Sequence, residues 1–232
     1  MSSERSEAVR VGLVALFVTA LVTSQLTASK LLAFSLPVSL PLAGGTLVLP
    51  GAALAYALTF FASDCYAELY GRRAATVVVN VGFAMNFVLL ALVWSTILAP
   101  GLPAQAQPVD LGAFRSVLGA STAIVVGSLS AYVVSQNWDV FVFHWLRERT
   151  DGEMLWLRNV GSTATSQLID TVIFVGVGFV VFQGLPPGEA LALIVGQYVL
   201  KLAIALLDTP FVYAVVGFAR RNGHAPAAPS AE

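Results

Sequence analysis

L-T-F-F-A-S-D-C-Y-A-E-L-Y-G-R-R, at residues 58–73, begins as an apolar, membrane-spanning helix and ends in two arginines. Two carboxylates, Asp64 and Glu68, lie inside the stretch, one helical turn apart on the same face. A charge at the centre of a lipid-embedded helix costs about 2.5–3.5 kcal/mol on insertion scales. We therefore expect Asp64 to face a protein interior or a water-filled cavity. Gly71 and the arginines end the span on the cytoplasmic side, so the stretch predicts a polar site within a membrane.

The composition also indicates a membrane protein. The 232 residues are 57% hydrophobic and 11% charged, against about 25% charged in an average soluble domain, and the mean hydropathy is +0.82. A net charge of -1 argues against nucleic-acid binding, which needs a basic face. The single cysteine, Cys65, can form no intrachain disulfide, and His144 and His224 lie in no ligand-like cluster. We predict no metal and no cofactor.

Apolar stretches long enough to cross a bilayer, which takes about 20 residues, predict an all-α integral membrane protein with six transmembrane helices. We place them at about 9–34, 49–70, 75–98, 113–149, 161–183 and 189–219. The uncharged loop at 35–48 contains prolines and glycines and is either a hairpin or a segment folded back towards the membrane. Residues 1–8 then form a short, frayed N-terminus, 9–219 one membrane domain, and 220–232 a disordered tail.

The distribution of arginines predicts the orientation. Nine arginines fall on the side of the termini, whereas only Arg115 falls on the other side. Because cytoplasmic loops carry the excess of basic residues, this asymmetry places both termini in the cytoplasm. The chain has no Walker-type phosphate loop and no sizeable soluble domain, so we expect that it does not hydrolyse nucleotide by itself.

Polar side chains within the predicted spans indicate a binding site. Both lysines of the chain, Lys30 and Lys201, lie in spans and are joined there by four aspartates. Helical spacing puts acids, amides and an amine on shared faces: Gln136 with Asp139, Gln167 with Asp170, and Gln197 with Lys201 and Asp208. These groups predict a pocket for a small, hydrogen-bonding solute. The predicted substrate-binding residues are Asp64, Gln136, Asp139, Gln167, Asp170 and Lys201. Supporting roles are assigned to Lys30, Ser63, Glu68, Asn80, Ser162, Thr163 and Asp208.

Several of these residues, taken singly, could have a structural role instead of a binding role. Lys201 could neutralise Asp170 or Asp64 in an ion pair, and Glu68 could form an interfacial salt bridge with Arg72, one turn on.

Lys30, near a helix end, could reach the membrane interface, and Asn80 could join helices by hydrogen bonds. The complete set argues for a site, because one ion pair would not require four aspartates within the spans.

Three stretches resemble the queuosine-precursor transporter family, also called the VUT family. They are T-F-F-A-S-D-C-Y-A-E-L-Y-G at 59–71, S-Q-N-W-D-V-F-V-F-H-W-L-R at 135–147, and W-L-R-N-V-G-S-T-A-T-S-Q-L-I-D-T-V-I-F at 156–174. The last helix adds Y-V-L-K-L-A at 198–203 and D-T-P-F-V-Y at 208–213. T-A-S-K-L-L at 27–32 is also similar, but Ser29 stands where the family pattern has an asparagine. The resemblance covers nearly the whole chain.

The resemblance implies a multi-pass protein of the inner (plasma) membrane of a prokaryote that takes up a 7-deazaguanine base. Such a base is 7-cyano-7-deazaguanine (preQ0) or its aminomethyl relative, salvaged for queuosine or archaeosine in transfer RNA. Its adjacent N–H donors suit the carboxylate of Asp64, Asp139 or Asp170. The amide of Gln136 or Gln167, or the amine of Lys201, could donate to the ring carbonyl.

The partners implied are the base and membrane lipid, with no nucleic acid. We also expect a homodimer. Transport could proceed by facilitated diffusion, by proton coupling, or with a separate ATP-driven module.

Two other functions are weighed against this one. The chain could be a transporter, or a substrate-binding subunit, for another nucleobase or a vitamin. The remote alternative is an intramembrane aspartyl enzyme, whose two carboxylates would share a proton. No aspartate of the chain lies in a G-x-G-D context, so we expect no enzyme.

Overall fold

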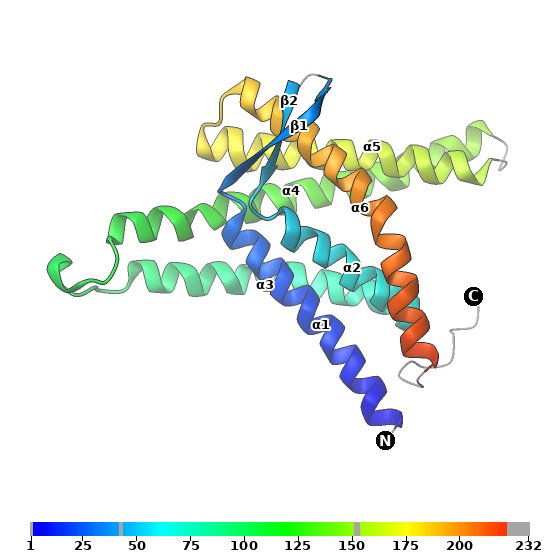
Figure 1. Cartoon of the computed structure of the whole chain (residues 1–232), viewed down its shortest axis with the longest axis horizontal. Coiled ribbons are helices and arrows are strands. Elements are labelled where there is room, and N and C mark those ends of the chain that lie inside the picture. Colours follow the sequence, from blue (N-terminus) through cyan, green and yellow to red (C-terminus); the bar gives the residue numbers. More distant parts are fainter. Residues whose placement is uncertain (1, 42–43, 151–153, 222–232) are drawn as a thin grey trace. The chain divides into compact units, whose positions relative to one another are not determined.

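The computed structural model describes residues 2–41, 44–150 and 154–221 (Figure 1). Helices dominate this part of the chain: α1 (Ser2–Thr27), α2 (Ala53–Tyr70), α3 (Arg72–Leu98), α4 (Leu111–Arg149), α5 (Leu155–Val175) and α6 (Pro187–Arg221). The strands β1 (Leu31–Leu40) and β2 (Gly44–Pro50) follow α1, the turn η1 (Ala104–Ala106) precedes α4, and the π-helical segment η2 (Gly176–Val181) continues α5. The predicted helical membrane protein is confirmed, with a short hairpin added.

The described residues contain five helical stretches that are long and apolar enough to cross a membrane. They are Ser6–Thr27, Arg72–Leu98, Leu111–Arg149, Val160–Val181 and Pro187–Arg221. The chain is therefore a multi-pass membrane protein. The predicted span at 49–70 corresponds to α2, which has 18 residues and is not among the five. Its carboxylates, Asp64 and Glu68, reduce its apolar character.

Several predicted boundaries were wrong. The first helix ends at Thr27 rather than near residue 34, because the following apolar residues turn and enter β1. Lys30 therefore lies in the turn before a strand and not on a helix. At the N-terminus, α1 already begins at Ser2, within the part that we expected to be frayed. The helix α6 begins at Pro187, the first helical position, where proline is favoured. Most of the predicted tail, residues 222–232, lies outside the described residues.

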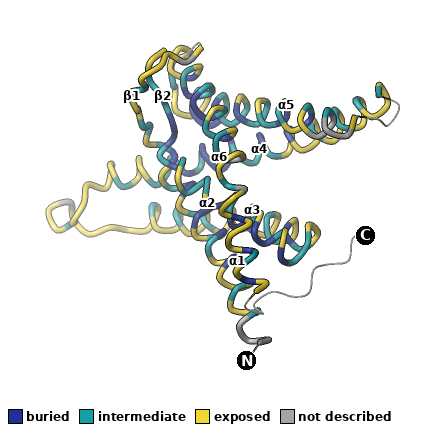
Figure 2. Tube along the Cα trace, turned by 45° about the vertical axis from the view of Figure 1, so that its right-hand side comes forward, coloured by how far each residue is buried: buried dark blue, intermediate teal, exposed yellow. Residues whose placement is uncertain are grey.

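The chain divides into two compact units. Unit 1 contains residues 1–28, 51–118 and 202–232, and unit 2 contains residues 29–50 and 119–201. Each unit has its own buried residues, which are dark blue in Figure 2, and each contains part of the predicted site.

The core of unit 1 lies along one face of α2. Ala62, Cys65, Tyr66 and Leu69, at helical spacing, are buried against α1 and the last part of α6. Asp64 lies between these positions and projects on the exposed side of α2. The expectation that Asp64 faces a protein interior or a water-filled cavity stays a prediction.

In unit 2, the predicted apolar loop is an antiparallel hairpin. β1 and β2 pair from Leu31 with Pro50 to Ser35 with Thr46, and the pairing then becomes irregular. Pro37 accounts for the irregularity, because proline has no N–H to donate to the neighbouring strand. β2 approaches α6 so closely that a β-carbon on Gly196 would overlap the carbonyl oxygen of Val48. Only glycine permits this contact between the hairpin and the helix.

The helices α4 and α5 pack antiparallel through small residues. Along α4, every fourth residue from Ala123 through Gly127 and Ala131 to Ser135 is buried. A β-carbon on Gly127 would lie 2.9 Å from the backbone nitrogen of Gly178 in η2. Small residues at this spacing let two helix backbones approach closely in a membrane. On the same face of α4, the polar side chains of Ser135 and Asp139 follow these small residues.

Candidate functional site

Two reciprocal hydrogen bonds join α4 to α5. The Ser135 hydroxyl on α4 lies 3.4 Å from Oδ1 of Asp170 on α5, and the Ser166 hydroxyl on α5 lies 3.3 Å from Oδ1 of Asp139 on α4. Each helix thus contributes a serine and, four residues on, an aspartate. Because the helices are antiparallel, each serine meets the aspartate of the other helix. The pattern brings two carboxylates into one polar patch between the helices.

A third helix joins this patch through Lys201. Its Nζ on α6 lies 2.5 Å from Oδ2 of Asp170, and the exposed fractions of the two side chains are 7% and 20%. Asp170 therefore binds α4 through one carboxylate oxygen and α6 through the other. Removing two charges from water costs free energy that only close pairing and further hydrogen bonds recover. The Lys201–Asp170 ion pair is one of the two pairings that the sequence left open.

Two amides lie one helical turn from the ion pair. Gln167 precedes Asp170 by three residues on α5, and Gln197 precedes Lys201 by four on α6. Oε1 of Gln167 and Nε2 of Gln197 are buried, and neither has a hydrogen-bond partner among the described residues. Buried polar atoms are nearly always paired in folded proteins. The two amides therefore hold unused hydrogen-bonding capacity next to a charged pair.

The other predicted residues of unit 2 lie on both faces of its elements. Gln136 is on the exposed face of α4, whereas Asp139 is half-buried. Ser162 is buried, and its neighbour Thr163 is exposed. Lys30 is exposed in the turn before β1. The structure thus brings together Asp139, Asp170 and Lys201, with Gln167 one turn away, and leaves Gln136 exposed on α4.

Unit 1 contains the remaining predicted residues. The carboxyl groups of Asp64 on α2 and Asp208 on α6 are close enough to interact electrostatically. Oδ2 of Asp208 is buried without a hydrogen-bond partner among the described residues. The Ser63 hydroxyl donates to the carbonyl of Phe60 at 2.9 Å and so serves its own helix. Asn80 is exposed on α3.

Glu68 is paired, but not with the expected residue. Its carboxylate lies 4.0 Å from the guanidinium of Arg220 on α6. The same guanidinium donates to the Glu68 backbone carbonyl at 2.9 Å. The expected pairing with Arg72 was therefore wrong, because α6 brings a second arginine to the end of α2.

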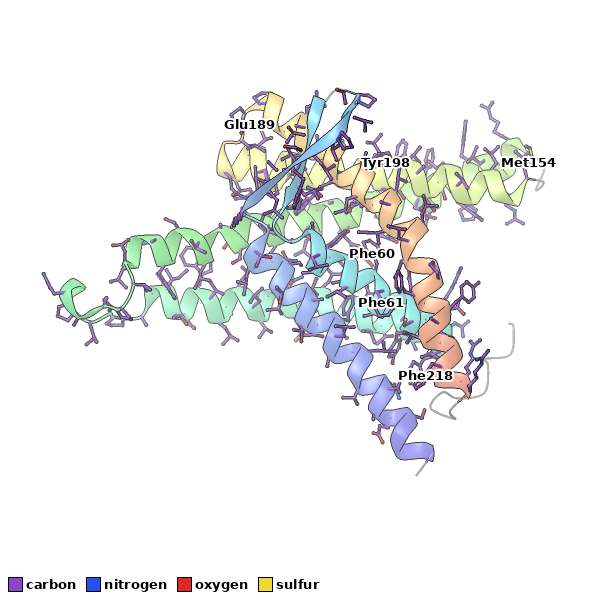
Figure 3. All side chains as sticks on the ribbon, viewed as in Figure 1. Phe60, Phe61, Met154, Glu189, Tyr198 and Phe218 are labelled. Atoms are coloured by element: carbon purple, nitrogen blue, oxygen red, sulfur yellow. The ribbon has the colours of Figure 1, made fainter. Side chains whose placement is uncertain are left out.

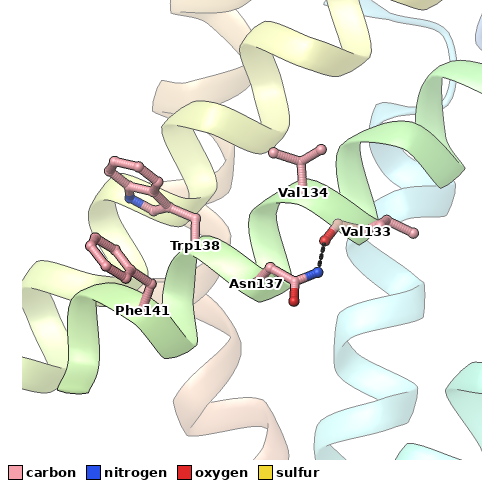
Figure 4. A pocket seen from close by; sticks show the side chains of 5 residues that line it. All are labelled: Val133, Val134, Asn137, Trp138 and Phe141. Carbon is pink, nitrogen blue, oxygen red and sulfur yellow. Dashed lines mark hydrogen bonds between the residues drawn. The ribbon is translucent and has the colours of Figure 1, made fainter. Parts of the chain in front are cut away.

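A hollow of about 490 Å³ lies on the surface of α4 (Figure 4). It is lined by Val133, Val134, Asn137, Trp138 and Phe141. The Asn137 amide donates to the Val133 carbonyl at 2.6 Å, and the Trp138 indole N–H donates to the Thr165 hydroxyl at 3.2 Å. The lining is aromatic and aliphatic apart from Asn137, and it includes none of the predicted binding residues.

Three residues of the polar patch were absent from the predicted site. Ser135 lies four residues before Asp139, and Ser166 lies four residues before Asp170, so each serine shares a helix face with an aspartate. This spacing could have indicated the two serines from the sequence. Gln197 was noticed on the stripe of Lys201 but was not assigned to the site. Across the described ranges, no group of three His, Cys, Asp or Glu residues could hold a metal ion.

Comparison with known proteins identifies the family. Residues 50–215 match the family model described as "Putative vitamin uptake transporter". The chain is also 35% identical over 161 residues to the "Probable queuosine precursor transporter" of Bacillus subtilis (strain 168), and the match covers 68% of each chain. No solved structure matches the chain. The matched region runs from α2 through most of α6. It therefore includes Asp64 and Asp208 of unit 1 and Asp139 and Asp170 of unit 2. The chain therefore belongs to the vitamin uptake (VUT) family of transporters, which includes this queuosine precursor transporter.

Proposed function

We propose that this chain imports a 7-deazaguanine base across the inner membrane of a prokaryote, as a precursor of queuosine or archaeosine. The observation that supports this substrate is the 35% identity to a relative named as a queuosine precursor transporter. The base is 7-cyano-7-deazaguanine or 7-aminomethyl-7-deazaguanine. We also propose that the chain works as a transporter and not as an enzyme.

The Lys201–Asp170 pair suits one edge of such a base. On that edge a ring carbonyl is followed by a ring N–H and an exocyclic amino group. A carboxylate can accept from the two adjacent N–H groups in bidentate fashion, while an ammonium group donates to the carbonyl. In the structure the amine and the carboxylate are adjacent, 2.5 Å apart, as the carbonyl and the ring N–H are on the base. Because the base is neutral, its entry between them leaves the net charge of this ion pair at zero.

The neighbouring groups give this pair a fixed position. Ser135 holds the second oxygen of Asp170 from α4, and Ser166 holds Asp139 from α5. We propose Asp139 as the second carboxylate of the site and Gln167 as a further binding residue; binding roles for Asp64 and Gln136 stay predictions from the sequence. In this mechanism the base contacts three helices, so its binding can bias how they pack.

The test is the accumulation of the modified nucleoside in transfer RNA from a host that cannot make the base. The host expresses the chain and receives 7-cyano-7-deazaguanine at nanomolar concentration. We expect the wild type to restore modification and the Asp170→Asn and Lys201→Ala variants to fail at equal membrane expression. Failure of the wild type with both the nitrile and the aminomethyl base would contradict the proposed substrate.

Asp110→Asn is the matched control for this experiment. Asp110 caps α4 by accepting a hydrogen bond from the backbone of Ala113 at 2.7 Å, and it is exposed. Asparagine caps a helix about as well as aspartate, so this variant should behave as the wild type.

A second candidate is uptake of another nucleobase or a vitamin, which the description of the matching family favours. Competition distinguishes the two. An excess of an unrelated base or vitamin that abolishes uptake of labelled 7-cyano-7-deazaguanine would support the broader transporter.

A further inference from the structure

Parts of four helices meet around the last turns of α2 in unit 1. The Arg10 side chain on α1 donates to the Tyr66 hydroxyl on α2 at 3.1 Å. The Arg220 guanidinium on α6 donates to the Glu68 carbonyl on α2 at 2.9 Å. The helix α3 begins at Arg72, one glycine after α2 ends. These contacts gather the first parts of α1 and α3 and the last turns of α2 and α6 at one end of unit 1.

This end of unit 1, which we call the basic end, carries an excess of positive charge. Its arginines with described side chains are all exposed: Arg10, Arg72, Arg73, Arg220 and Arg221. Two described glutamates, Glu7 and Glu68, lie with them. Within the described part of the chain, Arg72, Arg73 and Arg221 take part in no ion pair. Their guanidinium groups are therefore available to an anion from outside the chain.

The arginines of the basic end lie where apolar spans begin or end. The span of α3 begins at Arg72, and the span of α6 ends at Arg221. Arg10 is near the start of the span that begins at Ser6. Because such spans cross the hydrocarbon of the bilayer, their ends lie at the depth of the lipid headgroups. We therefore expect the basic end at one surface of the membrane.

Apolar side chains continue from these arginines along the outer faces of the helices. On α3, Val77 and Val81 follow Arg73 at intervals of four residues, and they are 61% and 53% exposed. On α6, Phe218 (labelled in Figure 3) lies three residues before Arg221 and is 68% exposed. A phospholipid has the matching shape, since its charged headgroup is joined to apolar chains. A soluble anion or an acidic protein would leave the apolar faces uncovered.

We propose that the basic end of unit 1 binds an anionic phospholipid, such as phosphatidylglycerol. The headgroup phosphate pairs with Arg72 and Arg73, because guanidinium groups bind phosphate oxygens in a bidentate manner. One acyl chain lies along the exposed face of α3. The other arginines of the basic end add to the positive potential that attracts the headgroup. A lipid that binds only the folded protein stabilises it, so the proposal predicts a rise in the unfolding temperature.

Purified protein in a neutral detergent tests the proposal with three probes. The probes are dioctanoyl phosphatidylglycerol, dioctanoyl phosphatidylcholine and inorganic phosphate, and each is followed by thermal unfolding and by equilibrium binding. We expect only phosphatidylglycerol to raise the unfolding temperature, and we expect high salt to weaken its binding, because salt screens exposed charges. Equal stabilisation by phosphatidylcholine would reduce the effect to apolar contact, and equal stabilisation by inorganic phosphate would reduce it to a free anion. Either result would overturn the proposal.

The Arg72→Gln/Arg73→Gln variant tests the assignment to these two arginines. Both side chains are exposed and in no ion pair with a described residue, so the lipid-free unfolding temperature should equal that of the wild type. A basic side chain near an anionic membrane surface contributes about fivefold to affinity. The Arg73→Gln variant should therefore bind phosphatidylglycerol about fivefold more weakly than the wild type, and the double variant roughly twentyfold more weakly.

Arg115→Gln is the matched control for Arg73→Gln. The Arg115 guanidinium lies over the Trp94 ring, 5.8 Å from its centroid. Trp94 is about 30 Å along α3 from Arg73 at the usual helical rise. This separation is beyond the range of about 10 Å over which exposed charges interact in salt, so Arg115→Gln should keep the wild-type affinity. An equal loss of affinity in the two single variants would overturn the proposal, since net charge alone would then explain binding. No response of the wild type to phosphatidylglycerol would also overturn it, and would leave the arginines to a soluble acidic partner.

Discussion

Lys201 and Asp170 form an ion pair between α6 and α5, with Nζ and Oδ2 2.5 Å apart and both side chains largely withdrawn from solvent. Removing one partner of a buried pair leaves a charge without compensation, which typically destabilises a protein by about 3–5 kcal/mol. Replacing both partners with apolar residues is often neutral or stabilising. The pair therefore allows its contributions to stability and to transport to be measured separately.

Lys201→Met and Asp170→Leu are expected to lower the unfolding temperature when made singly, and the double variant should recover most of the loss. Uptake of the base should be absent in all three, because neither polar partner of the substrate is restored. Thermal unfolding of purified protein and modification of transfer RNA provide the two measurements. Uptake by the double variant at the wild-type rate would show that the pair is structural only.

Gly127→Ala is expected to destabilise unit 2 by about 1–3 kcal/mol, the usual cost of an extra methyl group in a packed interface. The added β-carbon would lie 2.9 Å from the Gly178 backbone nitrogen, and backbone cannot move aside as a flexible side chain can. Gly119→Ala on the same helix is the control, because nothing lies within 4 Å of its β-carbon. It should be neutral or slightly stabilising, since alanine favours a helix over glycine by about 1 kcal/mol. Equal unfolding temperatures for the two variants would contradict the close packing of α4 and α5.

Gly196→Ala should displace the hairpin from α6, because its β-carbon would overlap the Val48 carbonyl oxygen. The expected result is a lower unfolding temperature and faster maleimide labelling of a Thr46→Cys reporter in a Cys65→Ala background. Gly188→Ala, on the same helix with nothing within 4 Å of the β-carbon, should change neither quantity. Unchanged labelling in Gly196→Ala would mean that β2 does not contact the helix at this position.

Tyr66→Phe tests the polar end of unit 1. The Arg10 side chain donates to the Tyr66 hydroxyl at 3.1 Å, and the tyrosine is 3% exposed. Loss of this hydrogen bond should lower the free energy of unfolding by about 0.5–1.5 kcal/mol. Tyr213→Phe, at a position that is 72% exposed, should have no measurable effect. If both variants are as stable as the wild type, the Arg10 contact does not contribute to folding.

The helices were predictable from the sequence, whereas the hairpin was only one of two alternatives for residues 35–48. Long apolar runs and the arginines placed helices close to α3, α4 and α6, whereas the first span was extended about seven residues past Thr27, as far as the start of β1. Residues 31–34 are apolar without alternation, as they would be in a membrane-spanning helix, so hydropathy alone does not mark that the helix ends at Thr27. Only the glycines and prolines of residues 35–48 indicated a turn.

The charged residues of the candidate site were predicted from the sequence, but which of them form ion pairs or hydrogen bonds with one another was not. Helical spacing identified Gln167, Asp170 and Lys201, because each lies on a polar stripe of its own helix. Which aspartate binds Lys201 depends on how α5 and α6 pack, and that information is not local in the sequence. Ser135 and Ser166 were missed because serine is common at helix interfaces and gives no signal without its partner.

The contact between Val48 and Gly196 also affects the order in which the chain can assemble. The hairpin leaves the ribosome early, whereas the helix that it packs against is among the last parts to be made. At a synthesis rate of roughly 5–20 residues per second, the delay is on the order of 10 s. During that time the hairpin's outer edges have no contact with α6, and unpaired backbone groups are costly in lipid. A chain truncated before Gly196 would keep the hairpin in this state, and membrane chaperones or proteases could distinguish it from the complete protein.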